Sequence, residues 1–127
     1  MVKRRITRQS AKAKGRDFQY WVCEQISNLL NIPWGSEELI ASREASTAGT
    51  DVKLIGEAKQ KFPFSVECKR YEKWDVQGWI KQAKRNQEEG TDWLLFIKRN
   101  HMDPVVVMDA ERFFELLGKQ GDNCEEE

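Results

Sequence analysis

The stretch "DWLLFIK" (92–98) constrains the fold more than any other part of the sequence. Its centre is a nearly continuous apolar run, which is typical of a strand that is buried on both faces. Such a strand needs a covering layer on each side of its sheet. We therefore expect a sheet with helices on both faces, and the rest of the chain has to supply those helices.

Apolar spacing predicts where the other elements lie. Phe18, Val22, Ile26 and Leu30 recur at helical intervals and predict a helix over 16–30. Further helices are predicted from residue 75 or 76 to about 89 and over 110–117, where Gly118 should end the last one. Strands are predicted near 39–42, 50–55, 62–69, 92–98 and 104–109, with a turn over 56–61. This order predicts an α/β domain with a mixed central sheet flanked by helices.

Composition excludes several classes of protein. A chain of 127 residues is expected to form one domain. It contains no run of 18 apolar residues, and no apolar segment follows the basic N-terminus, so we expect neither a membrane span nor a signal peptide. The three cysteines form no Cys-x-x-Cys pair, which argues against a zinc site or a disulfide framework. We expect a cytoplasmic protein.

Charge is distributed unevenly although the net charge is zero. Residues 1–16 contain seven basic residues and no acid, whereas residues 121–127 contain four acids and no base. We expect a flexible basic arm over 1–11, one domain over 12–118 and a disordered acidic tail over 119–127. The arm and its continuation provide candidate DNA contacts, although a plain solvated tail is the alternative: Arg4, Arg5, Arg8, Lys12, Lys14 and Arg16.

The predicted strand 62–69 carries an acid and a base on one face. Glu67 and Lys69 are two residues apart, so they project to the same side, while Val66 and Cys68 project to the other. The strand precedes a helix and a buried strand, which predicts a central position. Charges are costly there unless they have a function. The bland alternative is an exposed Glu–Lys pair that contributes well under about 1 kcal/mol.

Asp51 adds a second carboxylate to the Glu67–Lys69 pair. It opens the strand expected to form a hairpin with 62–69, so the carboxylates of Asp51 and Glu67 can converge. Together with the backbone carbonyl of Cys68, they would offer oxygen ligands to Mg²⁺, with Mn²⁺ as a substitute. Lys69 could hold a water molecule or neutralise charge on a phosphate. These are the parts of a phosphodiester hydrolase.

This arrangement resembles the PD-(D/E)XK nuclease superfamily, with a restriction-endonuclease-like core. The resemblance is carried by "KGRDFQ" (14–19), "REASTAGTD" (43–51), "FPFSVECK" (62–69) and "KQAKRN" (81–86). Within the superfamily, the chain looks most like Holliday junction resolvases of the archaeal type and their phage-encoded relatives. The resemblance implies metal ligands at Asp51 and Glu67 and a catalytic lysine at Lys69.

The resemblance also assigns roles to residues outside the strand pair. Gln19 stands where the archaeal enzymes have a glutamate on the first helix, which leaves the site one charge poorer and leaves Glu24 as a weaker candidate. Gln82 matches a glutamine that reaches the site from the second helix, and Arg43 matches a basic residue used on the DNA backbone. Their alternative role is that of ordinary surface residues.

The position of some further residues in the chain indicates a role in DNA binding or in the core. Arg70, Tyr71 and Lys73 follow the site and are candidates for DNA binding, with Trp74 as a further stacking candidate. Trp21, Trp79 and Trp93 are expected in the core.

The expected function is Mg²⁺-dependent cleavage of four-way DNA junctions by a homodimer, since two symmetric cuts need two active sites. The alternatives are another restriction-like or repair endonuclease of the superfamily and a non-catalytic module that binds DNA junctions.

Overall fold

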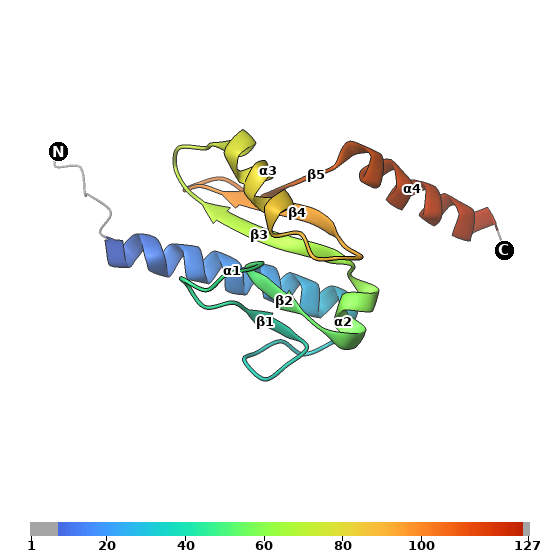
Figure 1. Ribbon diagram of the computed structural model, residues 1–127, viewed down its shortest axis with the longest axis horizontal. Coiled ribbons are helices and arrows are strands. Elements are labelled where there is room, and N and C mark those ends of the chain that lie inside the picture. The colour runs from blue at the N-terminus through green and yellow to red at the C-terminus, as the bar shows by residue number, and fades with distance from the viewer. Residues whose placement is uncertain (1–7, 126–127) are drawn as a thin grey trace.

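The fold is an α/β sandwich around one sheet. A computed structural model describes residues 8–125 of the chain (Figure 1). The elements in chain order are α1 (Arg8–Leu30), β1 (Ile40–Ser42), β2 (Val52–Leu54), α2 (Gly56–Lys61), β3 (Phe64–Arg70), α3 (Val76–Arg85), β4 (Asp92–Lys98), β5 (Val105–Met108) and α4 (Ala110–Glu125). None of the helices in this described part is long and apolar enough to cross a membrane.

The sheet is mixed, and its strand order is β1-β2-β3-β4-β5. β3 and β4 pair in parallel, with Phe64 opposite Asp92 and Arg70 opposite Lys98, and the other neighbouring pairs are antiparallel. The predicted central position of β3 and the bounds of β4 are confirmed.

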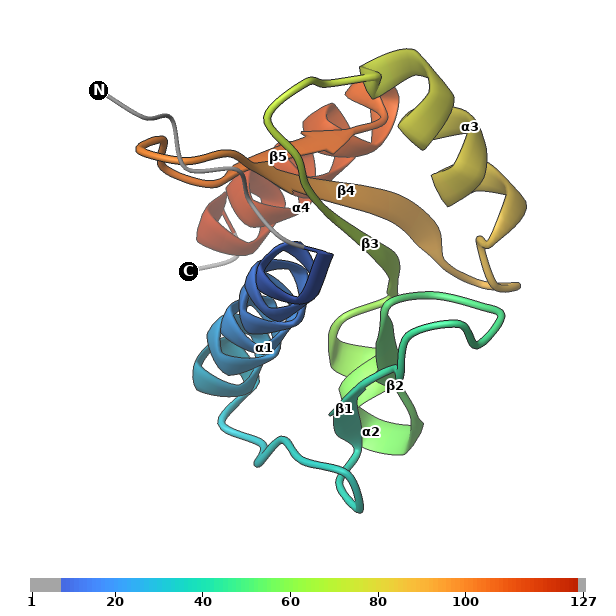
Figure 2. The same ribbon diagram turned by 90° about the vertical axis from the view of Figure 1, so that its left-hand side faces the viewer.

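The two faces of the sheet are covered by different helices, α1 on one side and α3 on the other (Figure 2). The larger core lies under α1, where Phe18, Val22 and Ile26 pack against Val66 and the hairpin strands. The smaller core lies under α3 and includes Ala83, Trp93, Leu95 and Ile97. The apolar run of β4 thus contributes to the core as predicted, because layers cover it on both sides.

The first helix is longer than its apolar spacing predicts. It begins at Arg8, so residues 8–11, expected in the flexible arm, form its first turn. This segment lacks apolar periodicity, but its Arg, Gln and Ala residues favour helix. The remainder of the predicted arm, including Arg4 and Arg5, lies outside the described residues.

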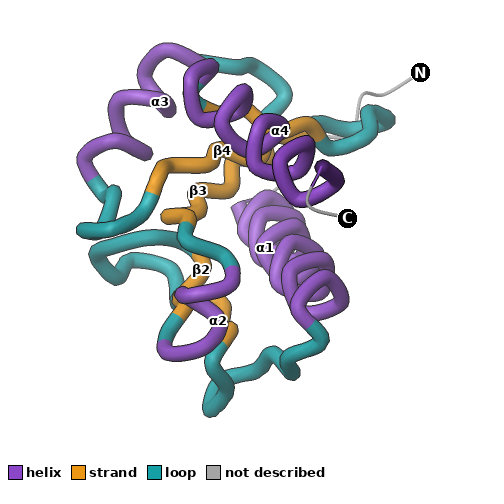
Figure 3. Tube along the Cα trace, turned by 90° about the vertical axis from the view of Figure 1, so that its right-hand side faces the viewer, coloured by secondary structure: helices purple, strands orange, loops and turns teal. Residues whose placement is uncertain are grey.

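Two other segments are helical where the sequence predicted otherwise. The expected turn over 56–61 is the short helix α2. Ala58 anchors this helix in the larger core, and an ion pair of 2.7 Å between Glu57 and Lys61 supports it. Figure 3 shows α2 beside β2. The last helix does not end at Gly118 but continues to Glu125, through residues 119–125 of the expected disordered tail. A glycine costs a helix only about 1 kcal/mol relative to alanine, and no proline follows to end it.

The three tryptophans expected in the core differ in burial. Trp93 is buried and Trp79 packs at the edge of the smaller core. Trp21 is wrongly predicted, since 43% of its surface is exposed. Helix α3 is shorter than predicted and is followed by Asn86 as its C-cap, whereas the predicted N-cap at Asp75 is confirmed by its contact with the backbone N–H of Gly78.

Candidate active site

The acidic pair forms where the β2–β3 ladder ends. The ladder pairs Val52 with Val66, and the backbone N–H of Asp51 donates to the carbonyl of Val66 at 2.9 Å. One step further, the backbone N–H of Cys68 donates to Asp51 Oδ2 at 2.7 Å. A side-chain carboxylate therefore takes the place of a ladder partner, and this contact fixes Asp51 beside β3.

Glu67 lies in the middle of β3 and is 1% exposed. Its Oε1 accepts a hydrogen bond of 2.8 Å from Asn86 Nδ2, and its carboxyl group is also hydrogen-bonded to that of Asp51. Burial, and after it the negative charge of Asp51, raise the pKa of Glu67 to about 7. The bond from Asn86 and the charge of Lys69 act in the opposite direction.

Lys69 completes the group that alternation predicts. It is half-buried, lies two residues after Glu67 on β3, and its charge acts on the Glu67 carboxyl. The structure thus brings together Asp51, Glu67 and Lys69 from two neighbouring strands.

Cys68 contributes its backbone and not its thiol. The side chain packs against the larger core on the α1 side, and burial raises the pKa of its thiol well above the ordinary value. The N–H and C=O groups of one strand residue point to the same side of the strand. Since the N–H of Cys68 points toward Asp51, its carbonyl also points toward the β2 side, where the carboxylates lie.

The donor set at this site fits a divalent cation. Two carboxyl groups lie next to each other, and the pKa of the buried one stays raised although the charge of Lys69 acts on it. A divalent cation would supply the further positive charge that stabilises both ionised forms. Among the residues that the structure describes, no group of three or more His, Cys, Asp or Glu side chains is placed to hold a metal. Asp51 and Glu67 are the two carboxyl groups at this site that could hold a cation.

Gln19 holds the backbone beside Asp51. Its Nε2 lies 2.8 Å from each of three oxygens, which belong to the hydroxyl of Ser42 and the carbonyls of Arg43 and Asp51. The amide amino group is engaged with the hairpin strands, so Gln19 positions the segment that carries Asp51. A carboxylate at this position would have no hydrogen to donate to these oxygens.

The other candidates from the resemblance lie in different surroundings. Glu24 accepts a hydrogen bond of 2.6 Å from the indole of Trp34 and is exposed. Arg43 donates through Nε to the carbonyl of Thr50 and lies against Gly49. Gln82 is half-buried on α3, and its backbone carbonyl accepts the N–H of Asn86.

Asn86 is the site residue that the sequence did not reveal. It stands four residues after Gln82, so both lie on the same side of α3, and its amide is the one that reaches Glu67. The signal was the pair of amide residues at helical spacing in "KQAKRN", of which only the first was selected.

The described candidate DNA contacts differ in exposure and in their partners. Arg70 and Lys14 both contact Asn100 Oδ1, at 2.6 Å and 3.3 Å. Tyr71 is exposed, as are Lys12, Arg16, Lys73 and Trp74. The structure describes Arg8 as part of α1.

The comparisons with known proteins identify the family. Residues 10–125 match the model of a family described as "Phage putative PDDEXK endonuclease". The chain belongs to this family. As a member, it is a nuclease of the PD-(D/E)XK type, with DNA as its substrate class, and nucleases of this type generally use divalent metal ions. No curated protein and no solved structure matched the chain.

The family name describes the motif found here. The sequence has acids and a lysine in the order of this name at Asp51, Glu67 and Lys69, with Thr50 where the name has a proline. The expected superfamily, the α/β fold and the relation to phage proteins are confirmed.

Proposed function

We propose that this chain is a Mg²⁺-dependent endonuclease that cleaves four-way DNA junctions, in the manner of the resolvases that its sequence resembles. The observation that supports the proposal best is the convergence of Asp51 and the buried Glu67 at the open end of the β2–β3 ladder. Cleavage of DNA by a phage endonuclease would take place in the cytoplasm of the host cell.

Some residues of the chain would bind the cation, and others would position those ligands. Asp51 and Glu67, with the carbonyl of Cys68, would hold the cation, and Asn86 would orient Glu67 through its 2.8 Å bond. When bound, the Mg²⁺ ion supplies a Lewis acid that activates water and stabilises charge on the phosphate. Lys69, on the same face as Glu67, would donate hydrogen bonds to the attacking water or to a phosphate oxygen.

The proposed DNA surface surrounds the end of β3 that follows the site. Lys14, Arg43, Arg70 and Lys73 would bind phosphates, together with the remaining basic residues of the N-terminal segment, and Tyr71 would contact sugars or bases. Binding would thus depend on shape and backbone charge and not on base sequence.

The decisive test compares DNA structures of the same sequence. A labelled four-way junction, a flap and a linear duplex are incubated with Mg²⁺ or with EDTA, and the products are separated on gels. We expect Mg²⁺-dependent cleavage with preference for the junction. Asp51→Asn and Glu67→Gln should each reduce the rate by roughly a hundred- to a thousandfold, whereas the exposed Glu38→Gln should not. An uncut junction, or mutants that cut as fast as the wild type, would refute the proposal.

A second candidate is a non-catalytic module that binds DNA junctions. It is favoured by Gln19, which stands in place of an acid and whose amino group is bound to the backbone. This candidate predicts junction binding that weakens steeply with salt but no cleavage with any divalent ion. Preferential cleavage of linear duplex would instead indicate a restriction-like or repair endonuclease.

We further propose that the active form is a homodimer. Six apolar residues along the edge strand β5 and helix α4, here called the C-terminal apolar surface, are each at least 36% exposed: Val105, Val106, Phe113, Phe114, Leu116 and Leu117. An exposed edge strand followed by exposed aromatic rings is typical of an interface. Helix α4 also extends away from the rest of the molecule (Figure 1).

Sedimentation tests the dimer. The wild type should sediment as a dimer, and Phe114→Glu should shift it toward the monomer, while the exposed Leu29→Glu on α1 should have no effect. A wild type that is monomeric at all concentrations, including in the presence of a junction, would contradict this part of the proposal.

A further inference from the structure

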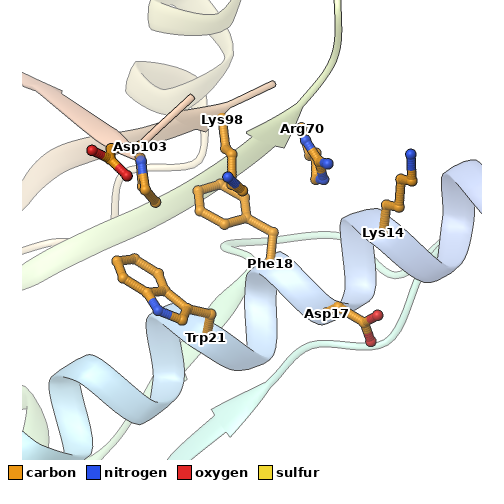
Figure 4. A pocket seen from close by; sticks show the side chains of 8 residues that line it. Lys14, Asp17, Phe18, Trp21, Arg70, Lys98 and Asp103 are labelled. Atoms are coloured by element: carbon orange, nitrogen blue, oxygen red, sulfur yellow. The ribbon is translucent and has the colours of Figure 1, made fainter. Parts of the chain in front are cut away.

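A cavity of about 480 Å³ lies on the α1 side of the sheet, at the ends of β3 and β4 (Figure 4). This volume lies within the range of small-molecule sites. Three basic side chains line it, Lys14 from α1, Arg70 from β3 and Lys98 from β4, together with the rings of Phe18 and Trp21. Neither the fold nor the proposed metal chemistry requires this combination.

Two acids, Asp17 and Asp103, also line the cavity, but neither forms an ion pair with its three basic residues. Arg70 and Lys98 are direct partners in the parallel register, so two like charges lie side by side on one face, which is destabilising. Within the described part of the chain, neither they nor Lys14 form an ion pair. Their observed acceptors are neutral, namely Asn100 Oδ1 and the carbonyl of Met102. The cavity thus has more basic than acidic side chains in its lining, and its cations are not ion-paired to any described residue, which fits an anionic ligand.

Trp21 adds an aromatic surface to this charge. Helical spacing predicted it in the core, yet it is 43% exposed and its ring stacks on Phe18, which is buried, with ring centroids 6.1 Å apart. Figure 4 shows both rings on the side of α1 that faces Lys98, while the carboxylate of Asp17 points away from them. A supported aromatic ring beside cations is the usual platform for an unpaired nucleobase.

Residues at this end of the sheet lead from the cavity toward α3 on the other face. A smaller cavity of about 120 Å³ shares Lys14 and Arg70 with the first and is also lined by Tyr71. The Tyr71 ring lies 5.4 Å from that of Trp79 on α3. Lys69 precedes Arg70 and projects to the opposite face. A strand that bends around this end of the sheet could therefore contact both the cavity and the candidate active site.

We propose that the cavity binds one unpaired nucleotide of a DNA strand, with its base on Trp21 and its phosphate among Lys14, Arg70 and Lys98. The inference rests on the proposed function, since it adds a requirement for unpaired DNA next to the cleavage position. It predicts that DNA with unpaired nucleotides at the branch point is bound more tightly than fully paired DNA.

The test measures binding of the full-length protein to a fluorescent oligo(dT) of about ten nucleotides, by anisotropy in EDTA, so that no cleavage occurs. Trp21→Ala should weaken binding about tenfold, and its matched control is Tyr20→Ala, an equally exposed neighbour that packs on Trp34 outside the cavity. Lys14→Gln should weaken binding and lower the salt dependence, and its control is the exposed Lys53→Gln on β2.

Each outcome is informative. Equal affinities for Trp21→Ala and Tyr20→Ala, or wild-type binding no tighter to oligo(dT) than to a duplex of equal length, would overturn the inference. Should Trp21→Ala fail to fold by circular dichroism, the comparison of Lys14→Gln with Lys53→Gln decides in the same way.

The cleavage assay separates this inference from the proposed function. If the wild type cuts the junction while Trp21→Ala binds oligo(dT) normally, the nuclease proposal stands and the cavity does not bind a nucleotide. If no substrate is cut while Trp21→Ala loses oligo(dT) binding, the cavity inference stands and the proposed reaction fails.

Discussion

The two faces of β3 serve different purposes, although their residues alternate along one strand. On the α1 face, Val66 is fully buried and Cys68 packs against the larger core. On the α3 face, Glu67 is almost as buried, but its neighbours are Asn86 and Asp51. Burial by itself therefore does not distinguish core from active site. Substitutions on the α1 face should change stability, whereas substitutions on the α3 face should change charge and chemistry.

The largest effect is expected for Gln19→Glu, which places an acid where the resemblance led us to expect one. The carboxylate cannot donate to the three oxygens that Gln19 now contacts. The free energy of unfolding at pH 7 should fall by about 4 kcal/mol, measured by urea unfolding. Gln25→Glu, an exposed change on the same helix, is the control. Unchanged stability together with faster Mg²⁺-dependent cleavage would show instead that position 19 faces the metal.

The raised pKa of Glu67 should make the stability of the protein depend on pH. Its pKa is about 7 in the folded protein, compared with an ordinary value of 4.5. Between these pH values the unfolded chain has lost the proton and the folded chain retains it, so stability falls as the pH rises from about 4.5 to 7. The loss is on the order of 3 kcal/mol.

Urea unfolding in EDTA at a series of pH values measures this slope. Glu67→Gln should abolish it, because glutamine does not titrate. Excess Mg²⁺ should restore stability at neutral pH in the wild type, since a ligand that binds only the folded state stabilises it. A slope that persists in Glu67→Gln would assign the titration to another group.

Val66→Ala tests the opposite face of the same strand. The side chain is fully buried in the larger core, so its truncation should lower the free energy of unfolding by about 2 kcal/mol. Cleavage per folded molecule should remain at the wild-type level. The control is Leu29→Ala, which truncates an exposed apolar residue. If Val66→Ala lost cleavage while its free energy of unfolding stayed at the wild-type value, the two faces of β3 would not differ in the way proposed here.

The smallest effect concerns Asn86. Its amide donates to Glu67 Oε1 and lowers the pKa of that carboxyl group. Asn86→Ala should raise this pKa by about one unit, which corresponds to about 1.4 kcal/mol. Carbon-13 NMR of the Glu67 carboxyl measures the shift, with the exposed Asn28→Ala as control. An unchanged pKa would mean that Asn86 is not coupled to the acidic pair.

Local patterns were sufficient for much of the fold and for the residues of the motif. The bounds of β4 followed from its apolar run, and the central position of β3 followed from its place before a helix and a buried strand. The assignment of Glu67 and Val66 to opposite faces needed only the two-residue period of a strand. Helix ends were less predictable, because α1 and α4 extend through polar segments that lack apolar spacing.

The sequence by itself determined the α/β class, the strand that carries the motif and the acids that belong together. These features depend on the spacing of residues that are close together in the chain, and this spacing is visible in the sequence. The tertiary structure alone decided that Gln19 binds the backbone beside Asp51, that Asn86 reaches Glu67, and that Trp21 faces a basic cavity. Each of these contacts joins residues far apart in the chain, so its geometry depends on how α1 and α3 pack on the sheet.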